Sequence, residues 1–356
     1  MMRFARPALI GLACLALGGC ANMGYYVQSM QGQLEIFRRE RPIAEVLAAG
    51  ETPAELRTKL QTALSIREYA SAALALPDND SYRRYADLQR PFAVYNVFVT
   101  PEFSLQPLEW CFPFAGCVKY RGYFSREEAE RFAAVMARRG HDVFIGGVPA
   151  YSTLGWFADP VLNTFVNYPR PELARLIFHE LAHQVVYVRD DSVFNESFAV
   201  AVEREGVRRW LEQHGSAQDR ELAARVQARR QAFIALVHAH RGRLEALYAS
   251  GLPDDEKRAR KRALFAQLDE AYEALRRTWG VMGGADRWLG QRPNNGLIAS
   301  VSIYTQLVPN FEALLRRHNG DLAAFYADVR SLAALPPPER MARLTAALEL
   351  QAASAH

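Results

Sequence analysis

Residues 173–206 read LARLIFHELAHQVVYVRDDSVFNESFAVAVEREG and contain the pattern H-E-x-x-H at His179, Glu180 and His183. On a helix, His179 and His183 are four residues apart and project from the same face. Two imidazoles placed in this way can bind one Zn²⁺ ion. Glu180 is rotated by about 100° around the helix from His179, so its carboxylate can reach a water on the metal without binding the ion. The pattern therefore predicts a zinc site with Glu180 as its catalytic base.

The residues around this motif predict two helices, over 171–187 and 192–214. Pro171 suits the first turn of the first helix, and the apolar residues that follow indicate that this helix is buried. A buried set of two histidines and a glutamate is costly without a metal or polar partners. The segment 189–191 interrupts the apolar pattern, and Asp191 or Ser192 can cap the second helix.

Glu196 is the residue that we expect to complete the metal site. If the two helices form an antiparallel hairpin, Glu196 and His183 come alongside each other. Glu203 is the second candidate, because two helical turns place it roughly 10 Å further along the axis. Asn195 would then lie beside the ligand and support it.

The run from His179 to Trp210 resembles the bacterial "predicted aminopeptidase" family of zinc lipoproteins. The resemblance extends to YRGYF at 120–124, YSTLGWFADPVLNT at 151–164 and NNGLIASVSIYTQLVPNF at 294–311. It implies a gluzincin-type metallopeptidase in which His179, His183 and Glu196 bind zinc and Glu180 is the base. The word aminopeptidase is the family's name, and these residues do not themselves demonstrate that activity.

Residues 1–20 are predicted to be a lipoprotein signal peptide. Arg3 and Arg6 precede an apolar run over 7–17 that is too short to span a bilayer. Leu17-Gly18-Gly19-Cys20 resembles a lipobox, which predicts that Cys20 is acylated and anchors the protein to a membrane. Because Ala21 rather than Asp follows, we expect an outer-membrane lipoprotein that faces the periplasm. The alternative is a plain signal peptide with an incidental cysteine.

The remaining chain, over 21–350, is predicted to be one zinc metallopeptidase domain. The 356 residues carry a net charge of +4, which becomes 4 − 2 = +2 once Arg3 and Arg6 are removed. This small excess does not favour nucleic acid as a partner. The sequence indicates peptide as the substrate and leaves the oligomeric state open.

Two cysteines remain if Cys14 leaves with the signal peptide and Cys20 carries lipid. In an oxidising compartment, Cys111 and Cys117 are expected to form a disulfide that closes the short loop CFPFAGC. A metal site that uses both thiolates is the alternative.

The predicted fold class is α+β and mostly helical, with a zincin-like core of a small twisted sheet, the H-E-x-x-H helix and the ligand helix. In zincin metallopeptidases the strand before the motif helix pairs with the substrate. Thr153 and Gly155 in YSTLGWF are therefore candidate substrate-binding residues, and a plain core strand is the alternative. The other elements expected are helices over 25–49 (broken at Pro42), 54–74 (with a capping box at Thr52) and 125–140, and strands over 93–99, 142–145 and 151–157.

Beyond the ligand helix, apolar spacing and alternating charge predict an exposed helical hairpin over about 216–278. The basic run 258–262 on this hairpin is read as a solvated face rather than a lipid contact. A helix follows Asn294 and contains Tyr304, which the family resemblance makes the candidate donor to the oxyanion of peptide hydrolysis. A packed tyrosine is the alternative for Tyr304, and a structural ion pair is preferred to substrate binding for Arg121.

Together these features predict a zinc-dependent peptidase of the cell envelope, and the family resemblance implies an aminopeptidase. An envelope endopeptidase that serves quality control uses the same metal site, and a lipoprotein in which metal only stabilises a scaffold is the third possibility. An aminopeptidase needs an acid for the free α-amine. Asp159, Glu203 and Glu205 are candidates, and no pattern singles out one of them.

Overall fold

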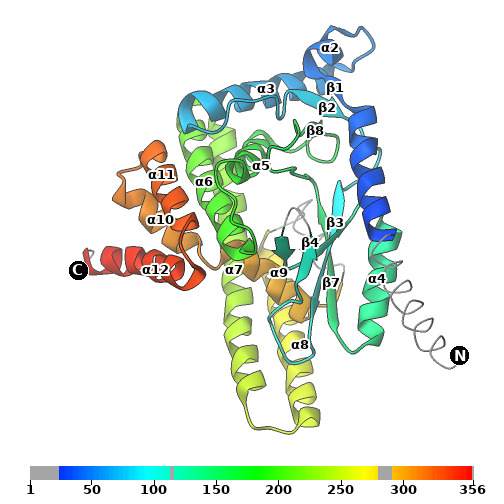
Figure 1. Ribbon diagram of the computed structural model, residues 1–356, viewed down its shortest axis with the longest axis vertical. Coiled ribbons are helices and arrows are strands. Elements are labelled where there is room, and N and C mark those ends of the chain that lie inside the picture. The colour runs from blue at the N-terminus through cyan, green and yellow to red at the C-terminus, as the bar shows by residue number, and fades with distance from the viewer. Residues whose placement is uncertain (1–23, 113–115, 280–290, 355–356) are drawn as a thin grey trace, which may run out of the picture.

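The computed structural model describes residues 24–112, 116–279 and 291–354. The chain is mostly helical, with three small sheets (Figure 1). The predicted signal peptide over 1–20, with Cys20, lies outside the described residues. Within them, no helix combines the length and the apolar character that a membrane crossing requires.

The N-terminal region contains the predicted helices, but the first turn of the second one is not capped in the predicted way. Pro42 splits the expected helix into a helix over 24–39, the two-residue strand β1 (Arg41–Pro42) and α2 (Ile43–Ala48), as its missing N–H favours. The helix α3 (Ala54–Leu74) begins after Pro53 without a side-chain cap. The predicted capping box is wrong, because the Thr52 hydroxyl donates to the Val46 carbonyl instead.

The prediction of a single small sheet is also wrong, since the strands form three. The fully buried strand β3 (Val94–Thr100) pairs antiparallel with β6 (Arg121–Tyr123) and β7 (Asp142–Val148), and α4 (Arg126–Arg138), capped by Ser125, packs against them. In the second sheet β2 (Arg84–Ala86) lies between β1 and β8 (Val161–Leu162). The strands β4 (Trp110–Phe112) and β5 (Gly116–Val118) form the third, where Cys111 and Cys117 are cross-strand partners joined by the expected disulfide.

The segment over 151–157 is a loop and not the expected edge strand. Leu154 and Gly155 have φ values of 57° and 83°, which an extended strand cannot accommodate. The Asp159 carboxylate accepts hydrogen bonds from the Thr153 N–H at 3.0 and 3.1 Å and so closes the turn. The Asp159 side chain, which lies outside the run 151–157, thus determines the backbone conformation of that run.

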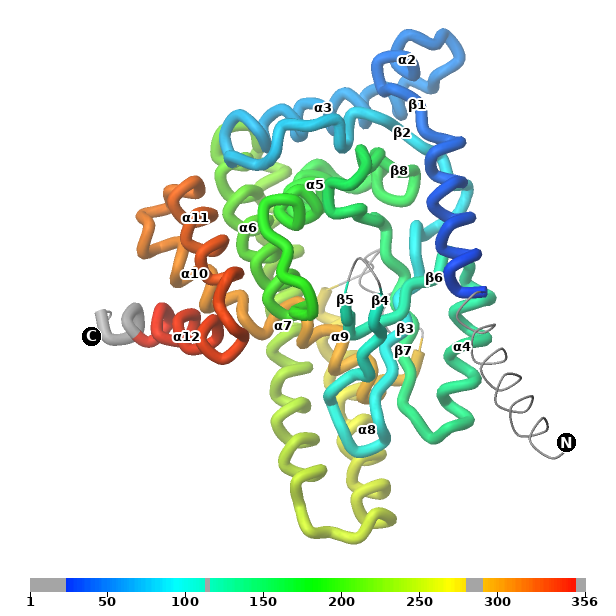
Figure 2. Tube along the Cα trace, viewed as in Figure 1, coloured from blue at the N-terminus to red at the C-terminus, as the bar shows by residue number. Residues whose placement is uncertain are grey.

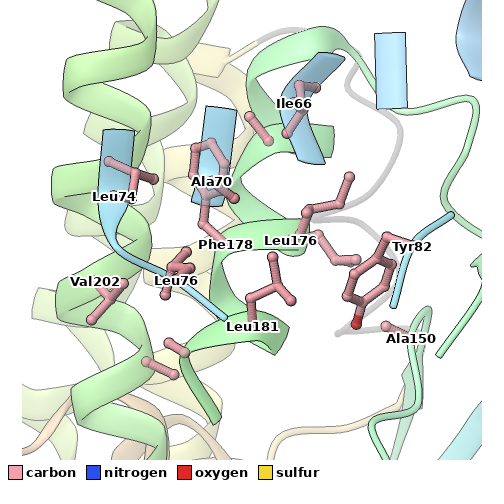
Figure 3. Close-up of a cluster of buried hydrophobic side chains, with 14 of the residues drawn as sticks. Ile66, Ala70, Leu74, Leu76, Tyr82, Ala150, Leu176, Phe178, Leu181 and Val202 are labelled. Atoms are coloured by element: carbon pink, nitrogen blue, oxygen red, sulfur yellow. The ribbon is translucent and has the colours of Figure 1, made fainter. Parts of the chain in front are cut away.

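The two helices of the central motif form the predicted hairpin. The helix α5 (Arg170–His183) ends four residues earlier than expected, and α6 (Ser192–His214) starts where the sequence indicates. Side-chain contacts pair residue 183 with 196 and residue 175 with 203, so the helices run antiparallel. Figure 3 shows Phe178 and Leu181 of α5 in one core cluster with Leu74 of α3 and Val202 of α6, and α5 contacts both of these helices. This burial against both helices holds α5 in place.

The remaining helices surround this hairpin. The predicted long hairpin consists of α7 (Ala217–Ala249) and α8 (Asp254–Trp279), which extend together away from the core (Figure 2). The helix α9 (Asn295–Thr305) packs against α6, α7, β3 and β7 and so joins the helical and sheet regions. The last three helices, of which α10 packs against α6, are α10 (Val308–Arg317), α11 (Leu322–Ala333) and α12 (Pro337–Ser354).

Candidate metal centre

The turn between α5 and α6 determines which residues face each other. Asp191 caps α6 by accepting a hydrogen bond from the Phe194 N–H. The Asn195 amide accepts from the Val188 N–H at 2.8 Å and donates to the Val188 carbonyl at 2.7 Å. Asn195, which we expected beside the ligand, thus contacts the backbone of the turn. Its two hydrogen bonds fix the start of α6, where Glu196 follows.

Three donor atoms converge where the two helices meet. The Nε2 atoms of His179 and His183 are 3.2 Å apart, and Glu196 Oε2 lies 3.3 Å from the first and 3.6 Å from the second. Ligands about 2.0–2.1 Å from a tetrahedral zinc ion are about 3.4 Å from one another. The side chains of His179, His183 and Glu196 therefore have the spacing of three corners of such a tetrahedron, and together they could hold a metal ion.

The chemistry of these donors also fits a cation. Glu196 Oε2 is buried and, across the part of the chain that the structure describes, forms no hydrogen bond. Burial lowers the pKa of His179, but its contacts with Glu196 and Glu203 raise it to about 10. Burial raises the pKa of Glu196, but the two histidines lower it to about 2. The group thus favours positive charge at its centre, which a proton or a metal ion can supply.

Glu203 lies at the other ring nitrogen of His179 and not with the three donors. Its Oε2 is 2.9 Å from His179 Nδ1 and 3.2 Å from Arg175 Nη1. Glu172 in turn pairs with Arg175 and with Arg230 of α7, both at 3.0 Å. Because a proton on Nδ1 that bonds Glu203 leaves Nε2 free, this contact orients His179 toward the centre.

Glu180 and Tyr304 border the same centre. Burial raises the pKa of Glu180, while the neighbouring His179 and His183 lower it. The ring of Tyr304 lies 6.4 Å from the ring of His179. Burial, followed by the negative charge of Glu196, raises the pKa of Tyr304 well above its ordinary value. Its hydroxyl therefore keeps its proton at neutral pH and can donate a hydrogen bond.

Two further tyrosines at the centre did not emerge from the sequence. Tyr120 is partly buried, and desolvation followed by the charge of Glu196 raises its pKa. Tyr82 has a φ of 64°, and its buried hydroxyl has no hydrogen-bond partner among the residues described. Tyr120 lies in the run YRGYF at 120–124, but no spacing in that run connects it with the metal centre. Arg121 stacks on the rings of Tyr25 and Phe132 at 4.2 and 4.9 Å, which agrees with a structural role.

The loop over 151–159 reaches the end of α5. A Cβ atom on Gly155 would lie 3.5 Å from Gln184, the residue after His183. The Thr153 hydroxyl accepts from the Phe157 N–H at 3.1 Å, and the Thr153 N–H donates to Asp159. Thr153 and Gly155 thus belong to a loop beside the metal centre.

Asp159 is the acid in this loop, and it is only 3% exposed. Burial raises its pKa to about 7, the hydrogen bonds from Thr153 oppose this rise, and the charge of Glu180 adds to it. The other two acids considered for an α-amine have partners of opposite charge. Glu203 bonds His179 and Arg175, and Glu205 bonds Arg208 and Arg209.

Comparison with known proteins gives one match. The model of a family described as "Putative aminopeptidase" matches residues 24–344 of the chain. No curated protein and no solved structure matches.

Proposed function

The chain belongs to the family described as "Putative aminopeptidase", and on this premise we propose that it is a zinc-dependent aminopeptidase of the cell envelope. The observation that carries the proposal is the convergence of His179, His183 and Glu196 at separations of 3.2–3.6 Å. These are the ligand types and spacings that zinc prefers in catalytic sites.

The residues of the centre have separate tasks in this proposal. His179, His183 and Glu196 would hold the ion, and Glu203 would orient His179. A bound zinc ion polarises a carbonyl group and lowers the pKa of water. Glu180 accepts a proton from the attacking water and delivers it to the amine that leaves. Tyr304 donates a hydrogen bond to the carbonyl oxygen as negative charge develops there.

Asp159 is the residue that we assign to the free α-amine of the peptide. It is a buried carboxylate close enough to Glu180 for their charges to interact, and it forms no ion pair with a basic side chain among the residues that the structure describes. A substrate ammonium group beside it would supply the missing positive charge. Thr153 and Gly155 would then lie along the first residues of the peptide. This assignment distinguishes an aminopeptidase from an endopeptidase, which needs no such acid.

Paired peptides test the proposal. The purified protein is incubated with a peptide library in free and N-acetylated forms, with and without a chelator, and its metal content is measured. We expect cleavage of the free peptides only, from their N-terminus, and loss of cleavage with the chelator. Cleavage of acetylated peptides would identify an endopeptidase, and bound zinc without any cleavage would identify a metal-stabilised scaffold.

Asp159→Asn separates the amine contact from the chemistry of hydrolysis. We expect a higher KM for free peptides, because the ammonium group loses its charged partner. The matched control is Asp269→Asn, an exposed position on α8. An unchanged KM in Asp159→Asn would exclude Asp159 as the amine site. Attachment to a membrane through Cys20 is a separate part of the proposal, and the mass of the N-terminal peptide tests it.

A further inference from the structure

The helix over 24–39 presents its apolar side chains outward. Val27, Met30 and Leu34 recur at helical spacing on the exposed face, and Met30 is 65% exposed. Gln28, Gly32 and Ile36 occupy the buried face. A helix that packs on a soluble domain has the opposite arrangement, with its apolar stripe against the core.

Specific contacts explain why a polar and a small residue face inward. The Gln28 side chain accepts a hydrogen bond from the Phe124 N–H at 3.0 Å, at the end of β6. A Cβ atom on Gly32 would lie 2.0 Å from the Phe124 ring, so that only glycine allows this approach. These contacts determine which face of the helix packs on the domain. Met30 and Leu34 lie on the opposite face and therefore point outward.

The loop beside the metal centre continues this exposed surface. Trp156 is 73% and Phe157 is 52% exposed, and the Phe157 ring contacts the Phe37 ring of the helix at 5.1 Å. Six of the seven large apolar side chains exposed on the described residues therefore lie on these two segments. We call them the apolar face, which comprises Tyr26, Val27, Met30, Leu34, Trp156 and Phe157. The seventh, Met341, lies on α12 at the other side of the molecule (Figure 1).

We propose that the apolar face rests on the surface of a lipid bilayer. Cys20, where the sequence predicts acylation, precedes Gly24 by four residues, and four residues span at most about 14 Å. The acyl chains would therefore hold the first turn of this helix against the membrane. Val27 to Leu34 extend for roughly 10 Å along the axis, and an interfacial helix inserts its apolar side chains by about 5–10 Å.

Two other features of the face suit a bilayer. Exposed tryptophan concentrates at the boundary between lipid and water, where Trp156 would lie. Arg38 follows Leu34 by one turn on the same exposed face and would meet anionic headgroups. Because Gly155 lies beside Gln184, this orientation also brings the loop next to the metal centre to the bilayer surface.

Quenching of tryptophan fluorescence by brominated lipids tests the proposal. The mature protein, isolated with its native N-terminus, is reconstituted in vesicles of phosphatidylethanolamine and phosphatidylglycerol, with or without brominated phosphatidylcholine. We expect the brominated lipid to reduce the fluorescence of the native chain much more than that of Trp156→Phe. Met30→Glu should decrease this loss, and the matched control Met341→Glu on α12 should leave it unchanged.

Three results would overturn the proposal. The first is equal quenching in the native chain and in Trp156→Phe. The second is an N-terminal peptide without acyl chains, since the argument for a bilayer begins at Cys20. The third is cross-linking between the Met30 positions of two copies without quenching by lipid, which would identify a second copy as the occupant. Circular dichroism checks that each variant is folded. We expect all of them to fold, because the substituted side chains are exposed.

Discussion

Replacement of Glu203 should weaken the metal site although Glu203 is not one of the three donors. The Oε2 atom of the buried Glu203 side chain serves both His179 Nδ1 at 2.9 Å and Arg175 Nη1 at 3.2 Å. Loss of a group that orients a metal-binding histidine typically reduces metal affinity by about 10–100-fold, or roughly 1.4–2.7 kcal/mol. Glu203→Gln keeps an acceptor oxygen and should fall near the lower value. Glu203→Ala removes the acceptor and should approach the higher one.

The same substitutions should also destabilise the metal-free protein. Arg175 would keep only Glu172 as its partner, and removal of one member of a buried ion pair costs about 3–5 kcal/mol when no other partner remains. Because Glu172 remains, we expect a smaller cost, on the order of 2 kcal/mol.

Competition with a zinc chelator on the folded protein measures the affinity, and thermal unfolding without metal measures the stability. Glu212→Gln is the matched control, because Glu212 lies on the same helix but is exposed and, among the described residues, pairs with Arg208 alone. If Glu203→Ala bound zinc as tightly as the control does, Glu203 would have no part in orienting His179. A loss of stability with unchanged zinc affinity would leave Glu203 with a structural role alone.

Three other substitutions test the remaining assignments. Glu180→Gln should retain zinc and lower kcat by about 10²–10⁴, the contribution of one positioned base, while Glu212→Gln keeps its activity; full activity in peptide assays would exclude Glu180 as the base. Tyr304→Phe should lower kcat by roughly 10²–10³ with little change in KM, whereas a packing residue would change stability instead. Asp159 has its pKa raised from 3.8 to about 7, so the stability that its protonated form contributes is present below about pH 4 and is lost as the pH rises through 7. The Tm of Asp159→Asn should therefore rise relative to that of the native chain between pH 5 and 8, as the variant's advantage in free energy of unfolding grows to on the order of 4 kcal/mol at most. A Tm difference that is independent of pH would contradict the burial of the charge.

The sequence predicted those elements that depend on interactions between residues close together in the chain. The spacing of His179 and His183, the break at 189–191 and the capping residue Asp191 are sufficient to predict the helix hairpin. The place of Glu196 followed from counting residues to the turn. Even the early end of α5 at His183 leaves this pairing intact, because His179 and His183 still lie within the helix.

Features that depend on distant contacts could not be predicted in this way. The loop over 151–157 has the composition of a strand, but Asp159 bonds Thr153 and overrides that tendency. The sequence offers Glu203 as the second candidate for the third ligand because its position along α6 can be counted, whereas its contact with Arg175 on the facing helix cannot. Tyr82 and Tyr120 reach the centre from the other parts of the fold, and no spacing connects them with the H-E-x-x-H motif.

The charges of the buried centre favour one class of ion. Six charged groups lie in and around the centre: the carboxylates of Glu172, Glu180, Glu196 and Glu203 and the guanidinium groups of Arg175 and Arg230. With both imidazoles neutral, their charges sum to −4 + 2 = −2. A divalent cation brings this sum to zero, whereas a monovalent ion leaves one negative charge in a largely buried group of side chains. Because unbalanced charge is costly away from water, the cluster as a whole favours a divalent ion. Arg230 comes from α7, so the long hairpin contributes to this balance although it lies outside the motif, and removal of α7 would leave the centre one charge more negative.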